Sequence, residues 1–326
     1  MSKVVPYLWS ACVALMGFLS AASAPARELR VADTHPQAYP TVQALEHMGR
    51  LLAERSNGRL TLKIFHSRVL GEEVETIQQT LAGALEMTRV NLTPLNATIP
   101  ETIVASLPFL FTSAAHMHRV VDGPVGAEIG RAFEAHGFVL LAYYDSGARS
   151  FYTHDKPIQR PADLKGLRIR VQQSPLAEAM VAALGARPTP LAYGQVAVAL
   201  KTRLIDGAEN NLPSYHDAGH YLAAGHYALT EHVMAPEVLM MSKRVWDQLP
   251  AADRALIRQA AADSVPEMRR LWAEREKIAA RALADAGIVP VAVDKAPFQA
   301  AMRPVYDRFA ATPALKDLVR RIQATR

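Results

Sequence analysis

Strand-like and helix-like patterns alternate along this chain of 326 residues. Strand patterns at 29–32, 60–65 and 87–92 are separated by two helix patterns. The first helix pattern runs over 41–55 and the second from about 72 to Gly83, where glycine supplies a helix end. Such β–α alternation favours parallel strands with helices packed on both faces of a sheet.

The same alternation of strand and helix patterns starts again in the second half of the chain. A nearly continuous apolar run at 138–144 predicts a strand that is buried on both faces. Strand patterns then recur at 167–171 and 188–191, with a helix between them that ends at Gly185 and another over 195–204. We therefore expect two α/β units, divided near residue 145.

The last quarter of the chain has a different character. Residues 251–286 are rich in Ala, Arg, Glu and Leu, Pro266 is the only strong breaker, and Gly287 follows as a terminus. This predicts one long helix, or two joined at Pro266. A continuous helix would span ~50 Å at about 1.5 Å per residue, which exceeds the width of one small domain. Such a helix either projects into solvent or lies across both units.

Residues 1–26 have the three parts of a secretory signal. Lys3 is the only charge, an apolar stretch runs from 8 to 19, and small residues follow. The apolar stretch is short for a membrane span, so a cleaved signal is expected, with an uncleaved anchor as the alternative. The only cysteine, Cys12, lies in this segment. The exported chain then has no disulfide and no thiolate metal site.

Composition and motifs exclude several functions. Apolar residues make up 50% of the chain, the formal net charge is +5, and the basic residues are scattered, so no nucleic-acid partner is expected. No phosphate-binding glycine loop, nucleophile elbow or zinc-protease motif is present. His216 and His220 have the spacing of half a metal site, but no third ligand accompanies them. We expect no metal and no cofactor.

Arginines stand where open α/β sheets bind ligands, at strand ends. Arg149 follows the apolar run at 138–144, and Arg168 and Arg170 flank Ile169 on one strand. A covered guanidinium is costly without an anion, and it can hold a carboxylate through two parallel hydrogen bonds. The residues therefore indicate either a carboxylate site or structural salt bridges.

Several segments around these arginines, taken in order, resemble the solute-binding subunits of TRAP (tripartite ATP-independent periplasmic) transporters, of the DctP type. The matching segments are 70–73, 107–111, 162–171, 183–186, 188–190, 193–196 and 205–211. The resemblance implies a two-lobed periplasmic binding protein of the Venus-flytrap kind, with a long helix across both lobes. Lobe I would comprise 27–146 plus about 236–275, and lobe II 147–235 plus about 276–326.

The resemblance also implies roles in the second lobe. Arg170 would pair with the substrate carboxylate, and Arg149 would be a second cationic contact. Asn210 would hydrogen-bond the solute, Tyr193 would form an aromatic wall, and Gln173 would add a polar contact.

In the first lobe, the resemblance places Asn91 and Glu73 at the site, with Thr34 or His35 at the first strand end. Arg89 alternates with Asn91 along its strand, which predicts that it faces the same cleft.

The solute is expected to be a sugar acid. The acidic and amide candidates, including Asn211, suit hydroxyl groups, whereas a plain dicarboxylate needs cations at both ends. The strings at 87–91 and 144–150 resemble a subgroup associated with hexuronates such as glucuronate and galacturonate.

The predicted mechanism is hinge closure around the ligand in the periplasm, followed by docking on the small and large integral-membrane permease subunits. Three alternatives remain at this stage. The ligand could be a dicarboxylate or keto acid, or the protein could serve an ATP-driven importer or a sensor. It could also be a periplasmic enzyme acting on sugar acids, for which Asp145 and Glu209 are the acid/base candidates. We expect a binding protein and not an enzyme.

Overall fold

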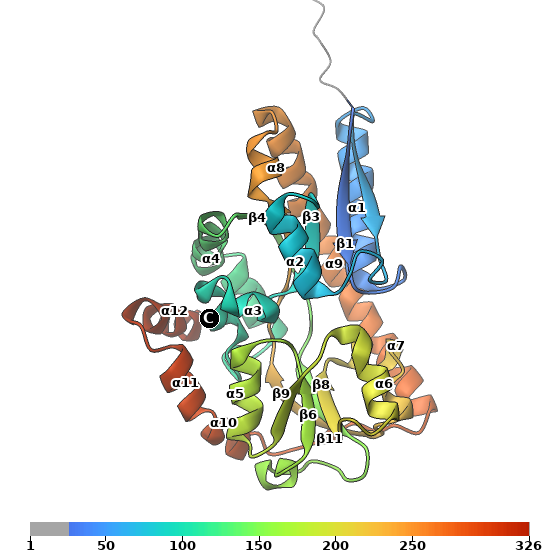
Figure 1. Cartoon of the computed structure of the whole chain (residues 1–326), viewed down its shortest axis with the longest axis vertical. Helices are drawn as coiled ribbons and strands as arrows, with labels where there is room; N and C mark the ends of the chain where they lie inside the picture. The colour runs from blue at the N-terminus through green and yellow to red at the C-terminus, as the bar shows by residue number, and fades with distance from the viewer. Residues whose placement is uncertain (1–25, 326) are drawn as a thin grey trace, which may run out of the picture.

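The computed structural model describes residues 26–325, and it contains two β-sheets with helices around them (Figure 1). The strands are β1 (Arg27–Asp33), β2 (Leu60–Phe65), β3 (Met87–Asn91), β4 (Phe138–Tyr144), β5 (Arg149–Thr153), β6 (Arg168–Val171), β7 (Arg187–Pro190), β8 (Gly207–Asn210), β9 (His226–Val233), β10 (Glu237–Ser242) and β11 (Val291–Ala292).

The α-helices are α1 (Pro40–Arg55), α2 (Glu73–Ala82), α3 (Ala114–Val121), α4 (Pro124–Ala135), α5 (Pro175–Ala183), α6 (Val196–Lys201), α7 (Leu212–Asp217), α8 (Lys243–Asp247), α9 (Ala251–Asp285), α10 (Ala296–Ala301), α11 (Arg303–Phe309) and α12 (Pro313–Ala324). Five short 3₁₀ segments join them: η1 (Thr93–Ala97), η2 (Pro100–Ser106), η3 (Pro161–Leu164), η4 (Tyr193–Gln195) and η5 (His220–Leu222). Within residues 26–325, none of the helices combines the length and the apolar character needed to cross a bilayer.

The first sheet has the strand order β2-β1-β3-β10-β4. The expected strands β1, β2 and β3 are parallel, and β10 enters between β3 and β4 as an antiparallel strand. Helix α1 buries Val42, Leu45, Met48 and Leu52, the apolar positions at helical spacing. Helix α2 ends at Gly83, which has the left-handed φ of 78° that glycine adopts readily.

Strand β4 corresponds to the apolar run that predicted a strand buried on both faces. Among the described residues it is an edge strand that pairs with β10. Leu140, Leu141 and Tyr143 are half-buried, and α4 and α9 both pack against the strand. The run is apolar because helices cover an edge strand, which the sequence pattern does not distinguish from an interior strand.

The second sheet has the order β11-β9-β5-β8-β6-β7. Strands β6, β7 and β8 are parallel, and β5 runs antiparallel to β8 and β9. Helix α5 follows β6, and Ser174 is the residue that precedes its first turn. The Ser174 hydroxyl does not cap the helix, however, and instead donates to Asn96 Oδ1 at 3.1 Å.

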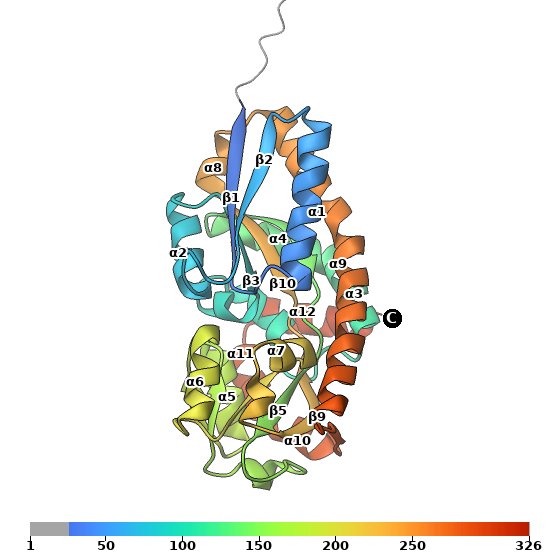
Figure 2. The same ribbon diagram turned by 90° about the vertical axis from the view of Figure 1, so that its right-hand side faces the viewer.

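Three segments connect the two sheets. Residues 145–148 join β4 to β5, residues 234–236 join β9 to β10, and α9 runs along the whole molecule (Figure 2). Helix α9 is continuous through Pro266, so the prediction of one long helix is confirmed. It packs against α1 and β4 at one end and against α7 at the other. The long helix therefore lies across both units instead of projecting into solvent.

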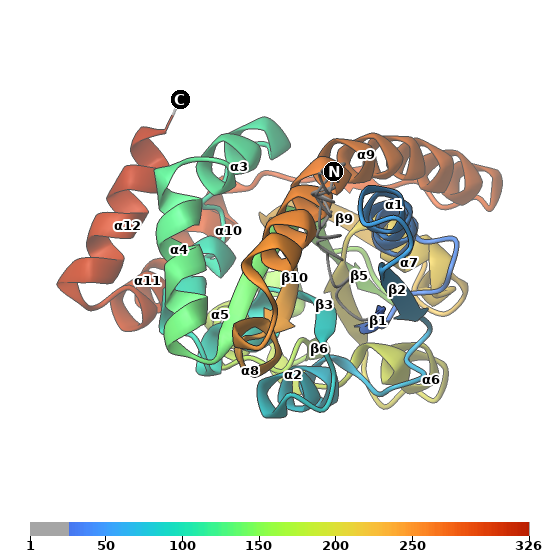
Figure 3. The ribbon, with the colours of Figure 1, turned by 90° about the horizontal axis from the view of Figure 1, so that it is seen from above.

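We propose that the lobes follow the two sheets, at the boundaries expected from the sequence. The C-terminal helix α12 returns to pack beside α4, opposite the side where α9 covers α1 (Figure 3). His116 Nε2 hydrogen-bonds Ile322 O at 2.9 Å in this contact. The predicted secretory signal lies outside the described residues, apart from Ala26.

Candidate functional site

A mainly polar cavity lies between the two sheets, and about 320 Å³ of space, including space open to solvent, lies among the atoms of its walls. The first sheet and α2 contribute Thr34, His35, Glu73, Asn91 and Glu237, and the second lobe contributes Arg149, Arg170, Gln172, Tyr193, Asn210, Asn211 and Ser214. Most of these residues stand at or just beyond the carboxyl ends of parallel strands, because those ends meet at one edge of each sheet. Nine of the eleven residues expected at the site line this cavity.

The lobes touch directly around the cavity. Tyr39 Oη and Ser214 Oγ are 2.8 Å apart, and Gly194 N donates to Glu72 Oε1 at 3.1 Å. The structure is therefore a closed arrangement, in which groups from both lobes face one volume.

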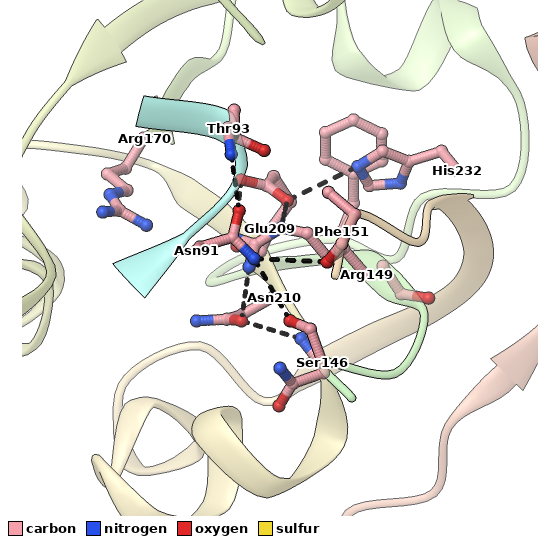
Figure 4. A network of polar contacts seen from close by, with 12 residues as sticks. Asn91, Thr93, Ser146, Arg149, Phe151, Arg170, Glu209, Asn210 and His232 are labelled. Carbon is pink, nitrogen blue, oxygen red and sulfur yellow. Dashed lines mark hydrogen bonds and ion pairs between the residues drawn. The ribbon is translucent and has the colours of Figure 1, made fainter. Parts of the chain in front are cut away.

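Arg170 is the cation in this cavity that lacks a protein counter-ion. It is 3% exposed, its Nε and Nη2 donate to Leu191 O at 2.9 and 2.7 Å, and within residues 26–325 it forms no ion pair. Figure 4 shows the guanidinium apart from the neighbouring hydrogen-bond network. Burial lowers the pKa of Arg170, and Arg149 adds to this effect, but an arginine remains charged at neutral pH. The Nη1–Nη2 edge is thus available to a carboxylate.

Arg149, by contrast, is already neutralised by the protein. Its Nε donates to Glu209 Oε2, its Nη2 to Glu209 Oε1 at 2.8 Å, and its Nη1 to Asn210 Oδ1 at 2.8 Å (Figure 4). Burial opposes ionisation of Glu209, but the Arg149 charge and the His232 ring outweigh it and lower the pKa of Glu209 to about 2. The salt-bridge alternative therefore holds for Arg149 even though it lines the cavity.

The amides of Asn210 and Asn211 are oriented by these contacts. Asn210 Oδ1 also accepts from Asn211 N at 2.9 Å, and Asn211 Oδ1 accepts from Ser214 N at 2.8 Å at the start of α7. Both carbonyl oxygens are occupied, so each residue has its NH₂ group left to donate to a ligand.

The first lobe contributes acceptors. Glu73 begins α2, and its Oε1 accepts from Asn91 N at 2.7 Å. Asn91 is held in place, because its Nδ2 donates to Glu237 Oε1 at 3.2 Å and its Oδ1 accepts from Thr93 N at 3.1 Å. The carboxylates of Glu73 and Glu237 suit ligand hydroxyl groups, which donate hydrogen bonds.

Aromatic rings close one side of the cavity. The ring of His35 stacks on Tyr39, with centroids 3.8 Å apart, and meets Tyr193 edge-on at 4.9 Å. Burial, together with nearby arginines, lowers the pKa of His35 well below its usual value, so the ring is neutral. Its Nδ1 has no hydrogen-bond partner among residues 26–325. Thr34 lies next to it at the end of β1.

Arg89 does not face the cavity, which corrects the expectation from strand alternation. It is 1% exposed and binds Asp33 through Nε at 2.7 Å and through Nη2, while Nη1 donates to Glu237 Oε2 at 2.6 Å. Its Nη2 also donates to Thr34 Oγ1 at 3.2 Å. Arg89 thus lies beneath the wall and holds Thr34 and Glu237 in position.

Gln173 is also displaced from its expected role. It is exposed, and Gln172 lines the cavity in its place. Arg170 and Gln172 are two residues apart, so the period of a strand continues through the strand end and puts both on one side. That alternation could have identified Gln172. Ser214 and Glu237 were missed as well, and no local sequence signal marks them.

Glu73 gives a first prediction. Burial and the neighbouring Glu237 raise the pKa of Glu73 to about 7, above the ~4.3 of an unfolded glutamate. The folded protein then binds more protons than the unfolded chain between these values. The stability that Glu73 contributes is present below pH ~4 and is lost as pH rises through 7.

Urea unfolding at pH 5 and pH 8 tests this effect. Glu73→Gln, which resembles the protonated acid, should be stabilised relative to the wild type at pH 8 more than at pH 5. Glu75→Gln removes the same charge from an exposed position of α2 and serves as the control. Parallel pH profiles for the wild type and Glu73→Gln would contradict the assignment.

Asp145 and Glu209, the acid/base candidates for an enzyme, do not line this cavity together. Glu209 is held by Arg149, and His118 Nε2 lies 2.6 Å from Asp145 Oδ1 beside a different cavity. His216 and His220 are likewise engaged separately, with Asp217 and with Tyr152. Among residues 26–325, no three potential ligands are grouped around a metal site.

Two lobes closed on a polar cavity, with one guanidinium in its wall that no described carboxylate neutralises, define a binding protein for small anions. Comparison with known proteins gives the family. Residues 31–312 match the model of the bacterial extracellular solute-binding proteins, family 7 (DctP). The chain belongs to this family, which comprises the solute-binding proteins of TRAP transporters.

Similar proteins support this assignment along the whole chain. A solute-binding protein of Chromohalobacter salexigens is 40% identical over 316 residues, which cover 95% of this chain and 94% of that protein. A TRAP periplasmic solute-binding protein of Bradyrhizobium sp. BTAi1, solved in complex with α/β-D-galacturonate, is 54% identical with a TM-score of 0.90. The match covers 92% of this chain and all of that one. A third, from Roseobacter denitrificans with bound β-D-glucuronate, is 41% identical with a TM-score of 0.90, over 92% of this chain and all of that one.

Proposed function

We propose that this TRAP solute-binding protein captures a hexuronate, galacturonate or glucuronate, by closing its lobes around the sugar. The observation that carries the proposal is the buried Arg170, which has no counter-ion among residues 26–325, opposite amides and carboxylates that suit hydroxyl groups. The bound sugars of the similar structures support the same ligand class.

We propose a role for each of the residues expected at the site from the contacts that it makes. Arg170 binds the carboxylate through its Nη1–Nη2 edge, as a two-point charge-assisted contact. The NH₂ groups of Asn210 and Asn211 donate to ring or hydroxyl oxygens, and Glu73 accepts from a hydroxyl. Arg149 acts chiefly by orienting Asn210.

Closure follows from contacts on both lobes. A ligand that touches Arg170 in one lobe and Glu73 in the other binds the closed state better than the open one, and it therefore shifts the population toward closure. The closed protein then delivers the sugar acid to the small and large membrane subunits of the transporter, in the periplasm. It binds the sugar without transforming it.

A thermal-shift measurement with galacturonate and glucuronate tests the proposal. Either uronate at 100 times its dissociation constant should raise the free energy of unfolding by about 2.7 kcal/mol. Galactose and glucose, which lack the carboxylate, should give little or no shift, and nuclear magnetic resonance of the mixture should show unchanged uronate. Stabilisation by succinate or pyruvate alone would contradict the ligand class, and turnover of the uronate would contradict the binding function.

A further inference from the structure

A second cavity lies at the junction of the lobes and shares no residue with the sugar-acid cavity. We call it the hinge cavity. A volume of about 420 Å³ lies among Met117 of α3, Asp145 and Met234 of the two connecting segments, and Trp272 and Glu276 of α9. Small-molecule sites typically measure roughly 300–1,000 Å³, occur at domain interfaces, and have apolar walls with a few polar groups. The hinge cavity has each of these properties.

The apolar part of the wall is formed largely by methionine and tryptophan side chains. Met117 and Met234 are flexible thioethers that adapt to a ligand, and the Trp272 indole offers a broad π face. Trp272 is 3% exposed, and its Nε1 lies near the Glu276 carboxylate without forming a well-aligned hydrogen bond to a described residue. A buried indole N–H normally has a well-placed acceptor, so an acceptor on a ligand would improve on the poorly aligned contact with Glu276.

The charged part of the wall leaves one carboxylate without a counter-ion. Asp145 contacts His118 at 2.6 Å, Glu231 pairs with Lys295, and Arg269 binds Asp122 at 2.8 Å. Glu276 forms no ion pair within the described part of the chain. Burial raises the pKa of Glu276; the contact with Trp272 opposes this effect, and the nearby Asp145 and Glu231 carboxylates add to it. A cation at Glu276 would relieve this repulsion.

We propose that the hinge cavity binds a small organic ammonium ion that carries an apolar body and one hydrogen-bond acceptor. The ammonium group lies between the Glu276 carboxylate and the Trp272 ring, which attracts cations through its π face. The acceptor receives the Trp272 Nε1 hydrogen, and the alkyl groups contact Met117 and Met234. The proposal concerns a site separate from the sugar-acid cavity and does not rest on the proposed function.

The position of the hinge cavity couples it to lobe closure. Gly147, in the segment between β4 and β5, lies so close to α9 that a Cβ there would be 2.8 Å from Glu276 Oε1 and 3.0 Å from Trp272 Cζ2. The cavity wall therefore includes residues of a segment that joins the lobes. A ligand with different affinities for the open and closed states must change uronate affinity, and the uronate must change its affinity by the same factor.

Choline and its uncharged isostere 3,3-dimethylbutan-1-ol provide a matched pair of probes. Titration calorimetry and Trp fluorescence of the full chain should show choline binding at least about tenfold more tightly, because only choline makes a charge-assisted contact. Glu276→Gln should remove this preference while leaving galacturonate affinity, measured without choline, at the wild-type value. Ala273→Leu, which adds bulk at an exposed position of the cavity wall, should weaken both probes.

Three results would overturn the proposal: no binding of choline, equal binding of the two probes, or a choline preference that persists in Glu276→Gln. Uronate binding is measured on the same samples, so a failure of this inference is distinguishable from a failure of the proposed function.

Discussion

Replacing Arg170 by methionine should lower hexuronate affinity by about 2–5 kcal/mol, or roughly 30-fold to 5,000-fold, because a buried carboxylate would lose its charged partner. The same substitution should not destabilise the ligand-free protein. Arg170 is a buried cation without a counter-ion within residues 26–325, so removing it from the ligand-free protein should leave the free energy of unfolding unchanged or raise it. Titration calorimetry with galacturonate and urea unfolding measure the two effects.

Arg168→Met is the matched control for Arg170. Arg168 lies on the same strand, but it is 42% exposed and pairs with Asp206 at 2.6 Å. Its loss should cost at most about 1 kcal/mol of stability and little affinity. Undiminished affinity in Arg170→Met would remove this arginine from the site, and equal losses in both variants would indicate a general effect of charge.

Replacing Arg89 by methionine should destabilise the fold by about 3–5 kcal/mol, since it leaves Asp33 and Glu237 buried without their cation. Burial alone would lower the pKa of Arg89, but the two carboxylates outweigh it and raise the pKa, which reflects how strongly they hold the charge. The midpoint of urea unfolding of the ligand-free protein measures the loss.

Arg30→Met is the control for Arg89. Arg30 forms an exposed pair with Glu86 at 2.8 Å, and its loss should cost at most about 1 kcal/mol. A similar small cost for Arg89→Met would show that the buried network does not support the fold. Together, the Arg89 and Arg170 variants separate a residue that holds the wall from a residue that binds the ligand.

The parts of the fold that could be predicted from sequence are those with local periodicity. The strands and helices from β1 to β3 and the continuous helix α9 follow from apolar spacing and from glycine at helix ends. The strands β9 and β10 were not assigned. Strand β10 is buried along its whole length and β9 along most of its length, so neither shows the strict alternation of apolar and polar residues that marks a half-buried strand. The division of the chain between the lobes remains a prediction, which the sheet order supports.

The same distinction applies to the site. Strand-end positions predicted the arginines of the cavity wall, since the carboxyl ends of parallel strands converge. The resemblance to TRAP solute-binding subunits supplied most of the amide, acidic and aromatic residues. The ion-pair partners could not be predicted in this way. Glu209 meets Arg149 because β5 and β8 are antiparallel neighbours, and Glu237 meets Arg89 because β10 lies beside β3. Neither pairing is visible in the local sequence, so free and neutralised arginines could not be told apart.

A crystal structure of the protein with galacturonate tests the central claim most directly. We predict that the sugar lies between the lobes with a carboxylate oxygen about 2.7–2.9 Å from Arg170 Nη1, while Arg149 keeps its contacts with Glu209. A bound sugar whose carboxylate lies away from Arg170, or an Arg170 that is paired instead with a protein carboxylate, would contradict the account.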